Sequence, residues 1–383
     1  MKKLLFLAIA LASGALVSTA ADKPRKLVLI AGKPSHPPGM HEFRAGSLLL
    51  EKCLQGIPGF KIEVHTNGWV SDEKTFADAD AVVIYADGGG GHPAVQGNHK
   101  EILGALVKRG VGLGCMHYGV EVVTDQAGDE FKRWIGGHYE NMFSCNPIWE
   151  PKFVSFPIHP ITRGVKPFSA NDEWYFNMRF ITKDAGNQPA EVAGEKFTPI
   201  LVAAPSEQVR NGPYVYPKGP YPHIQADKGR AECMLWAVER PDGGRGFGFT
   251  GGHFHDNWGN DDFRKTILNA MIWLTKAEVP QAGIESKVTQ AELDANLDPE
   301  PQPKAKAKGS PSKTQAKSNS TQIPQEKVPK TAPANELQRQ RLKRVAHSSP
   351  CLAPAPQHCA RVQCPQDFSP LLWSDRKSTR LNS

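Results

Sequence analysis

Histidines and carboxylates gather in four short segments of the chain. Each segment holds an imidazole close to an acid or a glycine run, and the four are SHPPGMHEF (35–43), DGGGGHP (87–93), CMHYGVE (115–121) and TGGHFHDNW (250–258). Because imidazole titrates near neutrality, such side chains suit general acid–base catalysis or coordination of a divalent metal. A lone histidine is more often a structural hydrogen-bonding residue, but four such segments together favour a functional cleft.

The strongest catalytic candidates are His117 and His253. His117 directly follows an apolar run, at the place of a nucleophile elbow, and His253 follows another such run. A carboxylate such as Glu121 or Glu173 could complete the set, as a general base or as a ligand of zinc or another divalent ion. The metal candidates are therefore His117, His253 and Glu121, although no HExxH or other local spacing supports a metal site.

The remaining polar residues and glycines of these segments include the candidates for substrate binding. They are His36, His41, Glu42, Gly89, Gly90, His92 and His255. The glycine run 88–91 offers backbone freedom and N–H groups that could face an anion or an oxyanion. It lacks the Lys and Ser/Thr of a P-loop and does not fit GxGxxG, so nucleotide binding is a weak interpretation. The alternative that the run is a tight loop without any ligand is also left open.

The segment DEWY (172–175) places carboxylates beside aromatic rings. Asp172 and Trp174 are candidates for carbohydrate binding, together with Trp149 and Trp258, because rings stack on sugar C–H faces while acids accept hydrogen bonds from hydroxyl groups. The alternative is that these rings fill the interior of a long insertion. Paired carboxylates also occur in glycosidases, but that function requires a separation that no sequence shows.

Buried strands must position these residues. Apolar runs predict strands over 26–31, 60–65, 79–85 and 112–116, and helical periodicity predicts helices over 42–54 and 99–109. This alternation indicates an α/β domain, a three-layer sandwich with a mainly parallel sheet covered on both faces. Ligands bind such sheets at the carboxyl ends of the strands, which is where the four histidine segments fall.

The pattern becomes less regular after residue 129. A short helix is expected over 131–135, and residues 138–225 are rich in loops, Pro, Gly and aromatic rings. Further strands are expected over 198–203, 233–239 and 245–250, and an amphipathic helix over 262–274 closes the domain.

The two ends of the chain differ from its middle. Residues 1–21 have the basic start, apolar run and small-residue end of a secretory signal peptide. We therefore expect an exported protein, periplasmic or extracellular, without a stable membrane span after signal cleavage. A folded domain is expected over 25–280 and a disordered basic tail over 281–383, whose last residues, 375–383, suggest a sequencing or frame artefact.

The net charge of +7 comes from the tail, because residues 304–383 hold 15 Lys and Arg against 4 Asp and Glu. The rest of the chain is mildly acidic, which argues against nucleic acid as a partner. The seven cysteines lack metal-finger spacing. The four that precede residue 300 are expected to be buried thiols rather than a disulfide framework.

Seven segments together resemble the ThuA-like family, named for trehalose utilisation. They are residues 35–46, 79–93, 110–121, 134–140, 159–168, 171–176 and 244–258, in order across about residues 25–280. The resemblance implies the class I glutamine amidotransferase-like fold, which is a flavodoxin-like α/β sandwich. It also implies a role in carbohydrate catabolism, with a small-molecule carbohydrate as partner.

Amidotransferases of this fold carry a nucleophilic cysteine at the elbow. Aligned on that pattern, His117 takes the position of the nucleophile, Cys115 precedes the turn, and His253 takes the position of the base. Because the acyl intermediate requires a thiolate at the elbow, glutamine amidotransferase activity is not expected.

The resulting hypothesis is an enzyme, a hydrolase or a lyase, that acts on a disaccharide or a 3-keto-glycoside. A keto group acidifies the neighbouring C–H bond, so a histidine or carboxylate could remove that proton while an imidazolium or a metal stabilises the enolate. A divalent metal such as zinc is the cofactor that these residues suggest. The alternative is a non-catalytic carbohydrate-binding module whose histidines hydrogen-bond the sugar.

Overall fold

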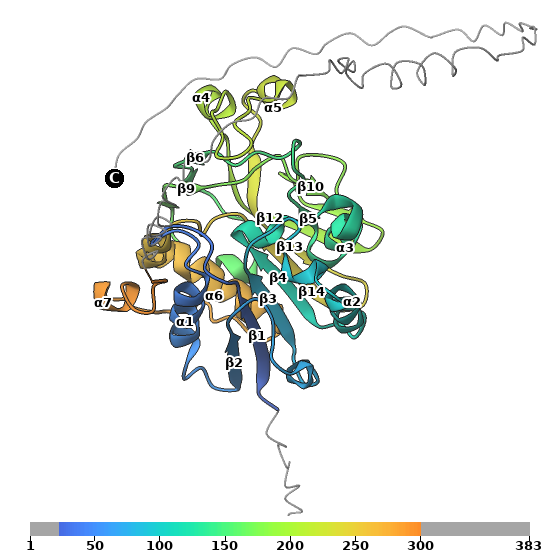
Figure 1. The fold of residues 1–383 in the computed structure, drawn as a ribbon, viewed down its shortest axis with the longest axis vertical. Helices are drawn as coiled ribbons and strands as arrows, with labels where there is room; N and C mark the ends of the chain where they lie inside the picture. Colours follow the sequence, from blue (N-terminus) through green and yellow to red (C-terminus); the bar gives the residue numbers. More distant parts are fainter. Residues whose placement is uncertain (1–22, 300–383) are drawn as a thin grey trace, which may run out of the picture. The chain divides into compact units, whose positions relative to one another are not determined.

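A mixed sheet of eight strands organises residues 23–299, the part of the chain that the computed structural model describes. The strand order is β11-β12-β13-β14-β4-β3-β1-β2. The five strands from β2 to β14 run parallel, and β13, β12 and β11 extend the sheet with antiparallel pairings. Figure 1 shows this sheet in the middle of the domain with helices on either side.

The parallel strands in chain order are β1 (Arg25–Ala31), β2 (Phe60–His65), β3 (Ala81–Tyr85), β4 (Gly112–Met116) and β14 (Arg245–Phe249). The antiparallel strands are β11 (Ala190–Val192), β12 (Glu195–Ala203) and β13 (Glu232–Glu239). The main helices are α1 (Phe43–Leu54), α2 (His99–Lys108), α3 (Asp129–Ile135) and α6 (Asp261–Leu274).

Two hydrophobic clusters fill the spaces between the three layers. The first contains buried residues of α1 and α6, and the second contains those of α2 and α3, so each helix pair covers one face of the sheet (Figure 1). Alternation along β1 explains the division, since Leu27 and Leu29 belong to the first cluster while Val28 and Ile30 belong to the second. The continuous apolar runs predicted from the sequence are therefore strands buried on both faces.

The irregular region after β4 forms short ribbons and single helical turns. The ribbons pair β5 (Gly137–His138) with β10 (Arg179–Phe180), β6 (Ile148–Trp149) with β9 (Asp172–Glu173), and β7 (Lys152–Phe153) with β8 (Phe168–Ser169). The short helices are η1 (Glu73–Phe76), η2 (Pro93–Val95), η3 (His117–Val120), η4 (Thr124–Gly128), η5 (Pro160–Thr162), α4 (Glu207–Arg210), α5 (Pro222–Ala226), η6 (His255–Gly259) and α7 (Gln290–Leu293). The ribbon of β6 and β9 matters most for function, because it carries Glu173.

The fold class expected from the sequence is confirmed, and the predicted sheet strands and main helices lie within three residues of their observed bounds. The packed region, however, extends past the expected boundary at residue 280. Leu293 of α7 is buried in the first cluster, and the Asp298 N–H donates a hydrogen bond of 2.7 Å to Glu42 Oε2. Residues 281–299 therefore belong to the folded domain rather than to the tail.

The predicted signal peptide over 1–21 and the tail from residue 300 onward lie outside the described residues. Between residues 23 and 299, no helix has the length and apolar character needed to cross a membrane. The four cysteines of this range are free thiols, and Cys115, Cys145 and Cys233 are buried.

Candidate metal centre and its cavity

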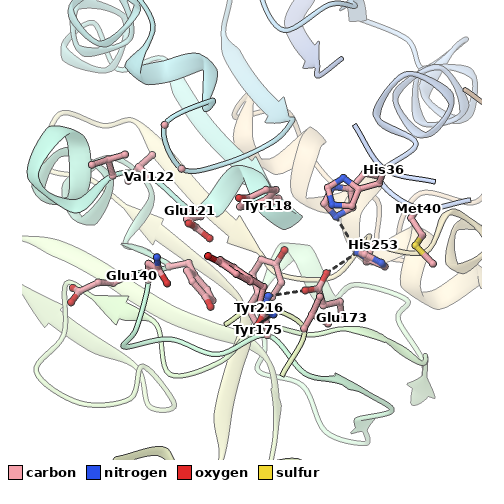
Figure 2. Close-up of a pocket in the computed structure, with 18 of the residues that line it drawn as sticks. His36, Met40, Tyr118, Glu121, Val122, Glu140, Glu173, Tyr175, Tyr216 and His253 are labelled. Carbon is pink, nitrogen blue, oxygen red and sulfur yellow. Dashed lines mark hydrogen bonds and ion pairs between the residues drawn. The ribbon is translucent and has the colours of Figure 1, made fainter. Parts of the chain in front are cut away.

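The carboxyl ends of four adjacent parallel strands surround one cavity of about 830 Å³. His36, Met40 and His41 follow β1, Gly89 and Gly90 follow β3, Tyr118 and Glu121 follow β4, and His253 follows β14. The order β14-β4-β3-β1 makes these strands neighbours, so side chains that are more than 200 residues apart in the chain meet at one edge of the sheet. Figure 2 shows His36, Met40, Tyr118, Glu121 and His253 among the residues around this cavity.

Three imidazoles and one carboxylate form the centre of the site. Donor atoms of His41, His117, Glu173 and His253 all lie within 4.8 Å of one another, and all four side chains are buried. His41 Nε2 lies 2.9 Å from His117 Nε2 and 3.0 Å from His253 Nδ1. Glu173 Oε2 lies 2.7 Å from His253 Nδ1 and 3.5 Å from His117 Nε2.

Hydrogen bonds to the outer ring nitrogens of His117 and His41 determine which nitrogens face this centre. The Thr250 carbonyl can only accept a hydrogen bond, so at 3.0 Å it fixes the proton of His117 on Nδ1. Asp87 Oδ1 lies 3.3 Å from His41 Nδ1 and favours a proton there. Burial and the neighbouring His117 lower the pKa of His41, so its ring is neutral. His41 Nε2 and His117 Nε2 therefore face each other at 2.9 Å, a contact that a shared cation between them, a proton or a metal ion, would bridge.

The donor set fits a divalent transition metal. Three imidazoles and a carboxylate are ordinary ligands of zinc, and separations of 2.7–3.5 Å suit atoms that share a central ion about 2 Å away. The carbonyl and carboxylate behind His117 and His41 match the outer hydrogen bonds that orient metal-binding histidines. We assign His41, His117, His253 and Glu173 as the candidate ligands.

The two carboxylates of the cavity differ in their ionisation. Burial alone would raise the pKa of Glu173, but hydrogen bonds with His117 and His253 lower it to about 2. Burial and the nearby charge of Glu173 raise the pKa of Glu121 to about 7. Glu173 is thus an ionised ligand, whereas Glu121 exchanges its proton near neutrality, as a general acid or base must.

The local backbone explains how His41 and His117 reach the centre. Both have φ values of 51°, in the left-handed region that non-glycine residues seldom adopt. At His117 this conformation turns the chain sharply from β4 into η3 and directs the ring toward Thr250 and His41. The elbow expected at this position is therefore present, and Cys115, one pleat earlier, packs in the second hydrophobic cluster.

The structure changes several of the roles that the sequence suggested. Glu121 lines the cavity but is outside the cluster of donor atoms, so Glu173 replaces it as the metal candidate. His41 was expected to bind substrate, but it lies at the centre of the cluster. His36, Gly89 and Gly90 line the cavity, and their part in substrate binding stays a prediction.

Three other candidates have structural roles outside the cavity. His92 caps η2 by accepting a hydrogen bond from the Ala94 N–H, and its other nitrogen contacts the Gly119 carbonyl at 2.8 Å. His255 Nε2 lies 3.0 Å from the Leu293 carbonyl. Glu42 accepts hydrogen bonds from the backbone N–H groups of Gly39 and Asp298. It therefore stabilises two loops instead of binding a ligand.

Asp172 and Trp174 also serve the framework. Asp172 is fully buried and accepts hydrogen bonds from three consecutive backbone N–H groups, those of residues 252–254, which holds the loop that carries His253. Trp174 and Trp258 are fully buried and Trp149 nearly so, so they belong to the core and none lines the cavity. The interpretation of these rings as interior filling was therefore the right one.

The aromatic rings of the cavity are tyrosines that sequence inspection did not single out. Tyr118, Tyr139, Tyr175 and Tyr216 line it. The Tyr175 hydroxyl lies 3.1 Å from His117 Nε2, and Asn146 donates a hydrogen bond of 2.8 Å to Glu173 Oε1. Asp87 was noted only as part of the glycine-rich loop, although its place directly after β3 was a usable signal.

A family model described as "Trehalose utilisation", ThuA, matches residues 28–274 of this chain. No curated protein matches it. Among the solved structures that are similar to this chain are two of ThuA-like proteins. The one from Bacteroides uniformis ATCC 8492 is 14% identical with a TM-score of 0.46, covering 67% of this chain and 94% of its own. The one from Parabacteroides merdae ATCC 43184 is 15% identical with a TM-score of 0.45, covering 70% and 94%.

Proposed function

The chain belongs to the ThuA family, described as acting in trehalose utilisation, and from this premise we propose that it is a metal-dependent enzyme of carbohydrate catabolism. Its substrate is a disaccharide or a 3-keto-glycoside, and its reaction is acid–base chemistry beside a sugar carbonyl or a glycosidic bond. The observation that carries the proposal is the buried cluster of His41, His117, His253 and Glu173, whose donor atoms lie within 4.8 Å of one another.

The residues around the cluster have distinct tasks in this proposal. A divalent ion held there would polarise a substrate oxygen as a Lewis acid. Glu121, with a pKa of about 7, removes a proton from the carbon next to the keto group and returns it to the product or leaving group. The Tyr175 hydroxyl, 3.1 Å from His117 Nε2, is placed to hydrogen-bond a substrate hydroxyl beside the centre.

The cavity supports a carbohydrate of this size. Its volume of about 830 Å³ lies within the range of small-molecule sites and allows more than one pyranose ring. Its tyrosine rings provide stacking surfaces, and Glu121, Asn141 and Asn146 provide polar contacts for hydroxyl groups.

Metal content is the first test of the proposal. The purified full chain, stripped with a chelator and reloaded with zinc, manganese or cobalt, should retain about one ion per chain by elemental analysis. His117→Ala should lose that ion, and His223→Ala, which removes an exposed histidine outside the cavity, should keep it. A full chain that holds no divalent ion at micromolar concentration would refute the metal centre.

Turnover is the second test. Disaccharides and their 3-keto derivatives are incubated with the metal-loaded chain and followed by NMR, with chelated protein and His117→Ala as negative controls. We expect turnover only with the metal-loaded chain and His223→Ala. Calorimetric binding of sugars without turnover by any metal form would instead favour the carbohydrate-binding module.

Export is proposed from residues 1–21 alone, which lie outside the described residues. Its test is expression of the full chain in a bacterial host, fractionation, and N-terminal sequencing of the product. Cleavage after the small residues 18–21 with recovery outside the cytoplasm would support it.

A further inference from the structure

Apolar side chains are exposed where the cavity opens to solvent. They lie on the segments that also hold Glu173, one of the candidate metal ligands. Ile148 is 48% exposed and Tyr216 is 73% exposed, and both line the cavity together with the half-buried Val215. We call these three residues the apolar rim. Large apolar groups left open to water at the edge of a cavity commonly mark a surface that a ligand covers.

The position of the apolar rim relative to the cluster follows from strand register. Ile148 of β6 pairs directly with Glu173 of β9, and paired residues of antiparallel strands project from the same face. Asn146 connects the rest of the rim, because its carbonyl and side-chain oxygen accept hydrogen bonds from the N–H groups of Val215 and Tyr216. The same Asn146 side chain donates to Glu173 Oε1, so the ligand carboxylate and the rim are held as one unit.

The charges of the cavity restrict what can bind beside the apolar rim. No Lys or Arg of residues 23–299 lines the cavity, whereas Glu121, Glu140 and Glu173 do. Glu140 is already paired with Arg179, at 2.6 and 3.0 Å. A phosphorylated or carboxylated ligand would therefore meet negative charge without a fixed side-chain cation, apart from a metal at the cluster.

We propose that, of the two substrate classes named above, this site takes the glycoside rather than the disaccharide: an uncharged glycoside whose apolar aglycone, such as an aryl group, packs against the apolar rim. In the bound substrate, the sugar ring lies over the cluster, and the aglycone extends out of the cavity along Ile148 and Tyr216. This inference rests on the proposed function, because it names the substrate class of the same site. It adds the prediction that a free sugar or a sugar phosphate is the poorer ligand.

The test compares matched probes by calorimetry on the zinc-loaded full chain. Phenyl α-D-glucoside should bind about tenfold more tightly than methyl α-D-glucoside, as expected for burial of an aromatic group. Glucose 6-phosphate should bind more weakly than either. The double variant Ile148→Asn, Tyr216→Ser should reduce the phenyl preference to less than twofold.

The matched control is Ile158→Asn, because Ile158 is fully exposed and does not line the cavity. It should keep the full phenyl preference. Equal affinity for the two glucosides in the unaltered chain, or tight binding of the phosphate, would overturn the inference. So would a double variant that keeps the phenyl preference, and a loss of self-association in that variant by sedimentation would show that the rim is a surface for a second copy.

Zinc stoichiometry on the same samples separates the two proposals. One ion per chain without any glycoside binding would overturn the substrate class and leave the metal centre intact. Absence of zinc together with absence of binding would overturn both.

Discussion

His41 uses its two ring nitrogens for different purposes. Nε2 faces the cluster, and Nδ1 lies 3.3 Å from Asp87 Oδ1, while Ser35 Oγ donates to the same carboxylate oxygen at 2.9 Å. The carboxylate thus holds the ring in the tautomer that leaves the inner nitrogen free for a metal. Asp87 is a positioning residue by this argument, since it acts through His41 rather than on a substrate.

Replacing Asp87 by Asn should weaken metal binding without removing any ligand. The amide oxygen is a poorer acceptor, so we expect zinc affinity to fall by about 10- to 100-fold while the fold is retained. Competition with a metal indicator measures the affinity, and circular dichroism checks the fold. Asp125→Asn, at an exposed site outside the cavity, is the control and should behave as the unaltered chain.

Glu121 offers a prediction in which activity and stability change in opposite directions. Because the folded pKa is raised from 4.5 to about 7, folding favours the protonated carboxyl, and stability falls as pH rises from about 4.5 through 7. Glu121→Gln should abolish this loss and raise the free energy of unfolding at pH 8 by about 1–3 kcal/mol.

The same variant should lose turnover, and turnover of the unaltered chain should rise with pH through about 7 as Glu121 ionises to a base. Denaturant unfolding and turnover across pH 5–9 measure the two effects. Full activity in Glu121→Gln would show that another group moves the proton.

At the scale of elements, tight loops after the strands decide where the site residues lie. The glycine-rich loop after β3 packs on the turn that follows β4. A Cβ at Gly88 would lie 2.4 Å from the Tyr118 carbonyl oxygen and 2.6 Å from its ring. A Cβ at Gly90 would meet no atom within 4 Å. Glycine is thus required for close packing at position 88 but not two residues later, at position 90.

Gly88→Ala should therefore lower the free energy of unfolding by about 1–3 kcal/mol, because the Tyr118 turn must shift to make room. Gly90→Ala should change it by no more than about 0.5 kcal/mol. Chemical denaturation of both variants measures the difference. Similar values for the two would mean that the loop moves freely and does not pack against Tyr118.

At the scale of the whole molecule, the segment after α6 completes the domain. Leu293 is buried against the first hydrophobic cluster, and its carbonyl lies 3.0 Å from His255 Nε2. The Asp298 N–H donates to Glu42, which immediately follows the metal candidate His41. The end of the described chain therefore supports the loop that carries one ligand.

Leu293→Ala should destabilise the full chain by about 2 kcal/mol, the lower end for a buried leucine, because α7 lies at the edge of the core. Thermal and denaturant unfolding measure the loss. Ala295→Ser, at an exposed position two residues later, should leave stability unchanged. If both variants unfold as the unaltered chain does, residues 281–299 contribute little to the fold.

The sequence by itself determined the sheet and the edge at which function is concentrated. Apolar runs long enough to be buried on both faces predicted the parallel strands, and histidines directly after them predicted where His117 and His253 would meet. Their ring centroids lie 5.3 Å apart. Such features are local in the chain, so residue pattern is sufficient to find them.

Only the tertiary structure decided which polar residues face the cavity. His92, Glu42 and Asp172 look like site residues in the sequence, but each satisfies backbone groups of a neighbouring loop. Glu173 replaced Glu121 in the cluster because the register of β6 with β9 carries it to the histidines. These outcomes depend on contacts between segments that are distant in the chain. Such contacts determine which side chains are buried and which hydrogen-bond partners they have, so the residue pattern does not reveal them.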